Sequence, residues 1–242
     1  MQSINLERVD NYTFRSNEAY NTLRTNIQFC GKDIKSICIT SCTPNEGKTV
    51  VSFSLATSMA EGGKKVLFID ADLRKSILIG RLKVDKAVLG LTQYLSGINK
   101  LEEVIYQTNI ENLDIIFTGP VPPNPSDLLG SEEFKDLIIT QRDAYDYIII
   151  DTPPLGAVID SANVAKFCDG VILVVQTNTI SYKFAQRVVK QLDKGSCRIL
   201  GAILNKIEFK HNGYYGKYHG SYYGNYYNSY SRKELSKKGD EK

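Results

Sequence analysis

The chain has 242 residues, of which 42% are hydrophobic, and a formal net charge of +3. These values fit one large globular domain with a sizeable core, and the charge is too weak to indicate nucleic-acid binding by itself. No stretch approaches the roughly 20 apolar residues of a membrane helix and the polar N-terminus lacks a signal-peptide core, so we expect a cytoplasmic protein that reaches a membrane only through a partner.

The predicted elements alternate between helices and strands along the chain. A first helix is expected at residues 18–29, where Tyr20, Leu23 and Ile27 recur at near-helical spacing. Apolar runs then predict strands at residues 36–40, 65–69, 113–117, 146–150, 170–175 and 198–204. Amphipathic patterns predict helices at residues 48–61, 131–142, 160–167 and 181–193. Continuously apolar strands are covered on both faces, so this order favours an α/β fold with a doubly wound, mostly parallel sheet flanked by helices.

A change in composition near residue 210 divides the chain. Residues 1–34 are expected to form an N-terminal helical segment, residues 35–209 the α/β core and residues 210–242 a tail. From Lys210 to Glu234 there is no Leu, Ile, Val or Met. Such a segment cannot bury enough aliphatic surface to offset the entropy lost on ordering, so we expect a flexible, disordered tail.

A phosphate-binding loop is predicted after the first core strand. Gly47-Lys48-Thr49 follows this strand and opens a helix, the context in which backbone N–H groups and the helix dipole bind phosphate in P-loop NTPases. Lys48 would contact the outer phosphates, and the Thr49 hydroxyl would bind Mg²⁺. Cys42 replaces the first glycine of the usual GxxxxGKS/T pattern, so the triplet alone also fits a chance strand-to-helix turn. The residues expected to contact ATP here are Thr43, Pro44, Asn45, Glu46, Gly47, Lys48, Thr49 and Val50.

Three aspartates follow predicted strands. Asp70 and Asp72 follow the second core strand and Asp151 follows the fourth, at the carboxyl ends where open α/β sheets bind ligands. One such aspartate often only caps a helix, but three in a chain with a GKT loop favour phosphoryl transfer. We therefore expect Lys48, Asp70 and Asp72 to be catalytic, and Thr49, Asp70 and Asp151 to hold Mg²⁺. Either Asp70 or Asp72 would accept the proton of the attacking hydroxyl.

The tail gathers eight of the chain's 15 tyrosines, namely Tyr214, Tyr215, Tyr218, Tyr222, Tyr223, Tyr226, Tyr227 and Tyr230. These phenols are candidate phosphate acceptors, because a phenol loses its proton far more readily than a serine hydroxyl. Alternatively, a Tyr/Gly/Asn-rich tail is a low-complexity tract that self-associates or binds RNA by stacking. The weak net charge and the attached phosphate site favour the acceptor role, so no nucleic-acid partner is expected.

In these segments the chain resembles the bacterial tyrosine kinases (BY-kinases) of capsular and exopolysaccharide synthesis, in the form that lacks its own membrane segment. The matching segments are residues 18–27, 41–49, 67–74, 119–129, 146–154 and 204–206, together with the tyrosine cluster. The resemblance implies ATP-dependent autophosphorylation of the tail in trans. It also implies recruitment to the inner face of the cell membrane by a transmembrane chain-length regulator that acts as an adaptor, with a protein-tyrosine phosphatase as the opposing partner.

Two further expectations rest on this resemblance alone. Members of the family form rings in which a Glu-x-x-Arg-x-x-Arg helix contacts a neighbouring subunit. Glu18 and Arg24 match that pattern and Asn21 replaces its middle arginine, so residues 1–34 are implied to mediate homo-oligomerisation through Glu18 and Arg24. Asn205 resembles the residue that contacts the adenine in the wider ATPase class.

Other classes of protein share the loop. Plasmid-partitioning and septum-placing ATPases carry a lysine near the loop start in a KGGxGK pattern, and Thr43 stands at that position here. Iron–sulfur relatives need cysteine ligands, but Cys168 is poorly placed to serve, and the five cysteines include no CxxC pair, which suits a reducing compartment. A nucleotide-gated scaffold without kinase activity is the third alternative.

Overall fold

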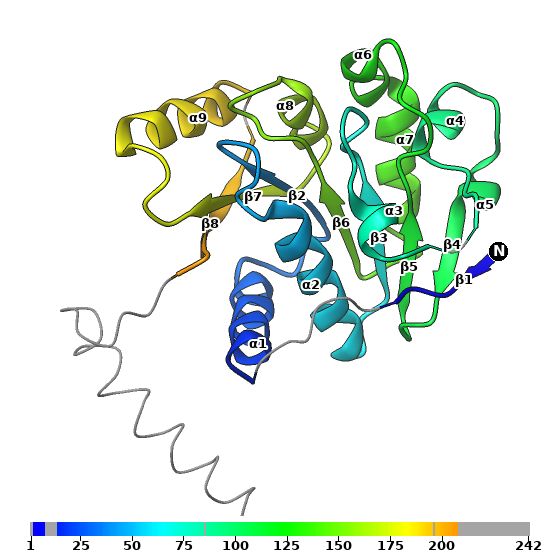
Figure 1. The fold of residues 1–242 in the computed structure, drawn as a ribbon, viewed down its shortest axis with the longest axis horizontal. Coiled ribbons are helices and arrows are strands. Elements are labelled where there is room, and N and C mark those ends of the chain that lie inside the picture. Colours follow the sequence, from blue (N-terminus) through cyan, green and yellow to red (C-terminus); the bar gives the residue numbers. More distant parts are fainter. Residues whose placement is uncertain (1, 8–13, 85, 196, 208–242) are drawn as a thin grey trace, which may run out of the picture. The chain divides into compact units, whose positions relative to one another are not determined.

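An eight-stranded sheet organises residues 2–7, 14–84, 86–195 and 197–207, which are the residues that this computed structural model describes (Figure 1). The strands lie in the order β1 (Gln2–Ile4), β4 (Ile105–Thr108), β5 (Leu113–Ile116), β3 (Val66–Asp70), β6 (Tyr147–Asp151), β2 (Ser36–Ser41), β7 (Gly170–Gln176) and β8 (Ile199–Asn205). β4 and β5 pair antiparallel, and all other neighbouring strands pair parallel. The predicted doubly wound, mostly parallel sheet is confirmed.

The described helices are α1 (Phe14–Phe29), α2 (Lys48–Glu61), α3 (Leu78–Arg81), α4 (Leu91–Leu95), α5 (Leu101–Val104), α6 (Pro125–Leu129), α7 (Glu132–Gln141), α8 (Asp160–Ala165) and α9 (Tyr182–Lys194). Serine side chains cap two of them. The Ser131 hydroxyl accepts a hydrogen bond from the Phe134 N–H, and the Ser181 hydroxyl accepts one from the Phe184 N–H, both at 3.3 Å. Each cap satisfies a backbone donor that the first turn leaves without a partner.

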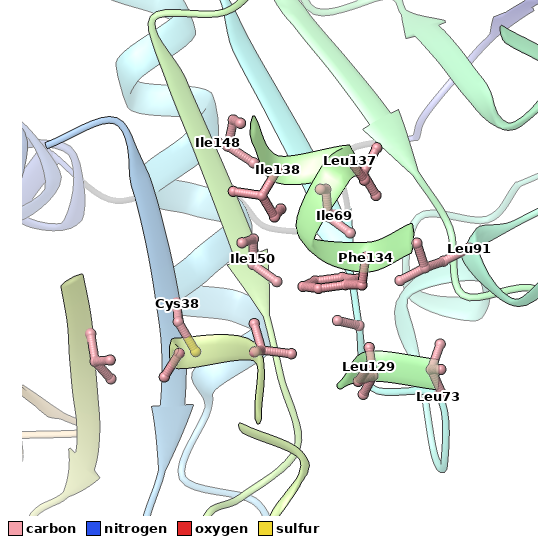
Figure 2. Close-up of a cluster of buried hydrophobic side chains, with 14 of the residues drawn as sticks. Cys38, Ile69, Leu73, Leu91, Leu129, Phe134, Leu137, Ile138, Ile148 and Ile150 are labelled. Carbon is pink, nitrogen blue, oxygen red and sulfur yellow. The ribbon is translucent and has the colours of Figure 1, made fainter. Parts of the chain in front are cut away.

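Alternate residues of the central strands supply two hydrophobic cores, one on each face of the sheet. On β3, Leu67 and Ile69 belong to one core, whereas Val66 and Phe68 belong to the other. Figure 2 shows Phe134 of α7 among strand side chains of the first core, and α1 and α2 contribute to the second. Because both faces are covered, the strands are apolar at successive positions.

All six predicted strands are present, with boundaries that differ by at most one residue. Helix α2 begins and ends as predicted, whereas α1 begins at Phe14 rather than at Glu18. Strands β1 and β4 and the short helices α3 to α6 were not predicted, because segments of three to five residues show no clear periodicity.

Residues 1–206 form one compact unit and residues 207–242 a second. Strand β1 pairs with β4, and α1 packs against α2, so the N-terminal segment contributes to the fold of the first unit. The predicted tail from residue 210, with all eight of its tyrosines, lies outside the described residues. Each helix in the described part of the chain is too short or too polar to span a bilayer.

Candidate active site

The candidate site lies where three neighbouring parallel strands end. Strands β3, β6 and β2 are adjacent in the sheet, and their register pairs Asp151 with both Asp70 and Ile39. Asp72 follows β3, and the loop from β2 to α2 leads to Lys48. The sheet order therefore brings the three predicted aspartates and the predicted lysine to one edge.

The phosphate loop has a backbone that only certain residues can adopt. Gly47 has φ 89° and Asn45 has φ 66°, in the left-handed region that Gly and Asn tolerate best. A Cβ atom on Gly47 would lie 2.3 Å from Asn205 Nδ2, so a larger residue would collide as well as strain the backbone. No side chain caps α2, and the N–H groups of its first turn are therefore suited to binding phosphate.

The loop is braced from within by Glu46, whose side chain is buried. Its carboxylate accepts hydrogen bonds from the Thr43 N–H at 2.7 Å and from the Gln176 N–H at 3.3 Å. The Ser41 hydroxyl also donates to the Thr43 carbonyl at 2.9 Å. Glu46 thus links the start of the loop to the end of β7, in addition to its predicted position beside ATP.

Of the other loop residues, Pro44 and Asn45 are exposed, and Val50 is half-buried in the first turn of α2. Asn205, at the end of β8, donates from Nδ2 to the Glu46 carbonyl at 2.8 Å. The predicted ATP-contacting segment and Asn205 therefore lie together.

Lys48 lies among the carboxylates. Its Nζ atom is 3.1 Å from Asp72 Oδ2 and 3.6 Å from Asp151 Oδ2, and it donates to Thr49 Oγ1 at 3.3 Å. Burial alone would lower the pKa of Lys48, but the negative charges of Asp151 and Asp72 outweigh burial and raise it. Lys48 is therefore positively charged at neutral pH and holds two aspartates near the start of α2.

Asp151 is 1% exposed, and neither carboxylate oxygen has a hydrogen-bond partner among the described residues. Burial raises the pKa of Asp151, and the Lys48 charge opposes that shift. Buried carboxylate oxygens in a native protein normally have partners. A buried carboxylate that faces Lys48 and Thr49 and lacks a complete hydrogen bond of its own fits Mg²⁺, which takes one or two protein oxygens and completes its shell with phosphate and water oxygens. No three His, Cys, Asp or Glu side chains within the described ranges form a metal cage of their own.

Asp70 and Asp72 differ in their surroundings. Asp70 is 1% exposed and accepts hydrogen bonds from the Asp72 N–H at 3.3 Å and from the Ser76 hydroxyl. Burial, reinforced by the charge of Asp151, raises the pKa of Asp70 to about 7. Asp72 is less buried, and its second oxygen accepts from the Lys75 N–H at 3.1 Å. Each is a candidate proton acceptor, Asp70 by its pKa and Asp72 by its greater accessibility.

The loop after β3 is tied to two helices by Arg74. Its guanidinium donates from Nε and Nη2 to the two oxygens of Asp160 on α8, at 2.7 and 3.1 Å. Nη2 also donates to the Ser126 hydroxyl of α6 at 3.1 Å, and that hydroxyl donates to Asp160. Sequence analysis missed Asp160 and Ser126, because neither stands in a local motif and both meet Arg74 only through the fold.

The two residues implied to mediate oligomerisation lie on α1. Arg24 Nη1 donates to the Ser58 carbonyl of α2 at 2.7 Å, within the same subunit. Glu18 accepts from Asn21 Nδ2 at 3.5 Å on its own helix. Arg24 therefore joins α1 to α2 in the subunit, and its contact with a second subunit remains a prediction.

Known proteins resemble this chain over most of its length. A family model described as an AAA domain matches residues 34–200. The tyrosine-protein kinase CpsD of Streptococcus agalactiae is 42% identical over 208 residues, which cover 84% of this chain and 91% of that protein. The solved kinase domain of Escherichia coli tyrosine kinase ETK is 36% identical, has a TM-score of 0.76, and matches over 82% of this chain and 80% of its own.

A more distant likeness bears on the positioning-ATPase alternative. The septum site-determining protein MinD from Pyrococcus horikoshii, solved with Mg-ADP, is 30% identical, with a TM-score of 0.63 and coverage of 73% of this chain and 72% of its own. Both kinases therefore match more of the chain at higher identity than this ATPase does, and the ETK domain also has the higher TM-score.

Proposed function

Because this chain belongs to the family of bacterial tyrosine-protein kinases, we propose that it uses ATP to phosphorylate its own C-terminal tyrosine cluster in trans. The chain is an enzyme, a protein-tyrosine kinase that contains an AAA domain. The process we assign to it is the regulation of capsular or extracellular polysaccharide synthesis and export.

The observation that carries this proposal is the position of Lys48. It opens α2 and lies within 4 Å of carboxylates at or just past the ends of two different strands, with Nζ 3.1 Å from Asp72 and 3.6 Å from Asp151. A lysine in that position can exchange its carboxylate partners for the outer phosphates of a nucleotide. The carboxylates are then available for a metal ion and for the acceptor hydroxyl.

The proposed chemistry assigns one task to each group. The phenol oxygen of the acceptor attacks the γ-phosphorus, the bond from that phosphorus to the β,γ-bridging oxygen breaks, and ADP leaves. The phenol proton passes to Asp70 or Asp72. Lys48 stabilises negative charge on the β- and γ-phosphates, and Thr49 and Asp151, with Asp70, would hold the metal ion. Mg²⁺, when bound, would neutralise phosphate charge that the protein alone cannot.

The tail tyrosines are the proposed acceptors. Eight phenols lie within residues 214–230, which contain no Asp or Glu. A segment without carboxylates approaches an acidic active site without like-charge repulsion. Transfer in trans is supported by the resemblance in the N-terminal helix, where Glu18 and Arg24 are proposed to contact a neighbouring subunit in a homo-oligomer.

The proposed partners rest on the family resemblance. They are a transmembrane chain-length regulator, which recruits the kinase from the cytoplasm to the inner face of the membrane, and a protein-tyrosine phosphatase, which removes the tail phosphates. The absence of a membrane-spanning helix in the described residues is compatible with recruitment through an adaptor.

Phosphosite mapping of the full chain tests the proposed function. After incubation with Mg-ATP, mass spectrometry should find phosphate on tyrosines between Tyr214 and Tyr230. Lys48→Met should reduce labelling at least about a hundredfold, because one well-placed group that stabilises developing charge contributes that much. Lys32→Met, which removes an exposed lysine, is the matched control and should label normally.

The other outcomes identify the alternatives. Release of inorganic phosphate without tail modification would favour the positioning ATPase. ATP binding without turnover would favour the scaffold. Retained labelling in Lys48→Met would mean that the phosphate loop has been wrongly assigned. Chelation of divalent cations by EDTA should stop labelling, and labelling that persists would remove Mg²⁺ from the proposal.

A further inference from the structure

The last described residues of the first unit contact the backbone carbonyls of the phosphate loop. Lys206 Nζ donates to the Asn45 carbonyl at 2.6 Å and to Gln176 Oε1 at 3.0 Å. The adjacent Asn205 Nδ2 donates to the Glu46 carbonyl at 2.8 Å. Two consecutive carbonyls of the loop are therefore bound by two consecutive side chains at the end of β8.

These contacts involve an unusual backbone. Lys206 has φ 55°, in the left-handed region that non-glycine residues other than Asn, Asp and His enter infrequently. Its own carbonyl accepts a hydrogen bond from Thr177 Oγ1 at 2.8 Å. A residue keeps such a conformation when surrounding contacts fix it. In this position the backbone directs the Lys206 side chain back to the loop.

The geometry of the peptide bond links these carbonyls to the phosphate-binding side. In a trans peptide the C=O of one residue and the N–H of the next point in opposite directions within one plane. The Lys206 donor that holds the Asn45 carbonyl on its own side therefore directs the Glu46 N–H to the opposite side, and the Asn205 donor on the Glu46 carbonyl does the same for the Gly47 N–H. Inward-pointing N–H groups are what a phosphate loop presents to its ligand.

We propose that Lys206 is a positioning residue of the nucleotide site: by holding the Asn45 carbonyl, it orients the loop N–H groups that bind the triphosphate. The inference rests on the proposed use of this loop to bind ATP. It assigns Lys206, immediately before the second unit of the chain, to nucleotide affinity rather than to chemistry. Asn205 acts beside it on the next peptide group, in addition to its predicted contact with adenine.

Replacement of Lys206 in the full chain tests the proposal. Lys206→Met should raise the Kd and the KM for Mg-ATP about tenfold, the order expected for losing one charge-assisted hydrogen bond. The kcat at saturating ATP should change less than threefold, because a filled loop has already adopted its binding conformation. The thermal midpoint without nucleotide should stay within about 2 °C of the parent value, since an exposed lysine contributes little to the core.

Two matched variants complete the test. Lys206→Arg keeps a long cationic donor and should return the Kd to within threefold of the parent, and Lys190→Met, which removes an exposed charge from α9, should leave it unchanged. The proposal is overturned by an unchanged Kd in Lys206→Met, or by a loss that Lys206→Arg does not reverse. If Lys206→Met fails to fold, the Lys206→Arg Kd alone decides: a value more than tenfold above the parent overturns the proposal. Because the readout is ATP binding, the proposal for Lys206 is tested separately from the proposed labelling of the tail.

Discussion

At the scale of single residues, the active site concentrates charge that folding alone would disfavour. Lys48 is one positive charge among Asp70, Asp72 and Asp151, and all four residues are buried. A buried carboxylate costs stability unless it is paired and hydrogen-bonded. We interpret this cost as the consequence of preparing a site for a polyphosphate and a divalent cation, because structural needs would be met better by apolar side chains.

Asp70 provides a test through its titration. Its pKa is raised to about 7, so in the folded protein Asp70 is protonated at pH 5 and ionised at pH 8, whereas in the unfolded chain it is ionised at both. As the pH rises from 5 to 8, Asp70 therefore loses its proton in the folded state, and this lowers the free energy of unfolding. The Asp70→Asn variant has no such proton to lose and keeps that stability. The advantage of Asp70→Asn in the free energy of unfolding should grow by about 2.5 kcal/mol from pH 5 to pH 8.

Urea denaturation without nucleotide at the two pH values measures this difference. Asp127→Asn, which changes an exposed carboxylate on α6, is the control and should shift stability by less than about 0.5 kcal/mol at either pH. An Asp70→Asn advantage that is constant across the range would show that the Asp70 pKa is not raised. Because Asp70 is a proposed catalytic group, the same variant should lose kinase activity while it gains stability.

At the scale of elements, the Arg74–Asp160 pair holds the loop after β3 against α6 and α8. Asp160 is fully buried, whereas the Arg74 side chain is 41% exposed, so solvent screening reduces the strength of the pair. Arg74→Met leaves the Asp160 carboxylate without its cation and should lower the free energy of unfolding by about 2 kcal/mol at pH 7.

The effect of Arg74→Met should depend on pH with a definite sign. Burial would raise the pKa of Asp160, but Arg74 and Ser126 overcome this and lower it. The pair therefore stabilises the fold above the usual carboxyl pKa and loses that effect as the pH falls through the lowered value. The penalty should shrink between pH 5 and pH 3 in denaturant titrations, and the adjacent exposed Lys75→Met should show almost none at any pH. A penalty as large at pH 3 would refute an ionic origin.

The six core strands and the clustered aspartates were predictable because their signals are local. Each strand is a mainly apolar run, and Asp70, Asp72 and Asp151 each lie at or just past the end of one of them. A parallel sheet then brings strand ends to one edge without further information. β1 and β4 were not predictable, since three or four residues carry too little pattern to distinguish a strand from a loop.

The residues that the sequence did not reveal act across long separations. Asp160 contacts Arg74, from which it is separated by 86 positions in the sequence. Lys206 contacts Asn45, from which it is separated by 161 positions. No spacing rule connects such pairs, because their meeting depends on the order of the strands and on side-chain directions. The Glu46 carboxylate was expected beside ATP from its place in the loop, and its hydrogen bonds to the Thr43 and Gln176 N–H groups became visible only in the fold.

At the scale of the whole molecule, the chain divides the proposed reaction between two units. The first, residues 1–206, carries the loop lysine and the aspartates, and the second, residues 207–242, carries the tyrosine cluster. Each added phosphate would bring about −1.5 to −2 charges to a segment that lacks acidic residues between Glu208 and Glu234. Since the two parts are separable in sequence, their roles can be tested in different chains.

The most direct test mixes two altered chains with Mg-ATP. One ends at Lys210 and keeps the active site without the acceptor tyrosines, and the other is the full chain with Lys48→Met, which keeps the acceptors without the loop lysine. Phosphotyrosine should form between Tyr214 and Tyr230 of the Lys48→Met chain in the mixture, and at least about a hundredfold less in that chain alone. No labelling in the mixture, although the unaltered chain labels its own tail, would contradict transfer between subunits; equal labelling of the Lys48→Met chain alone would contradict the active site itself.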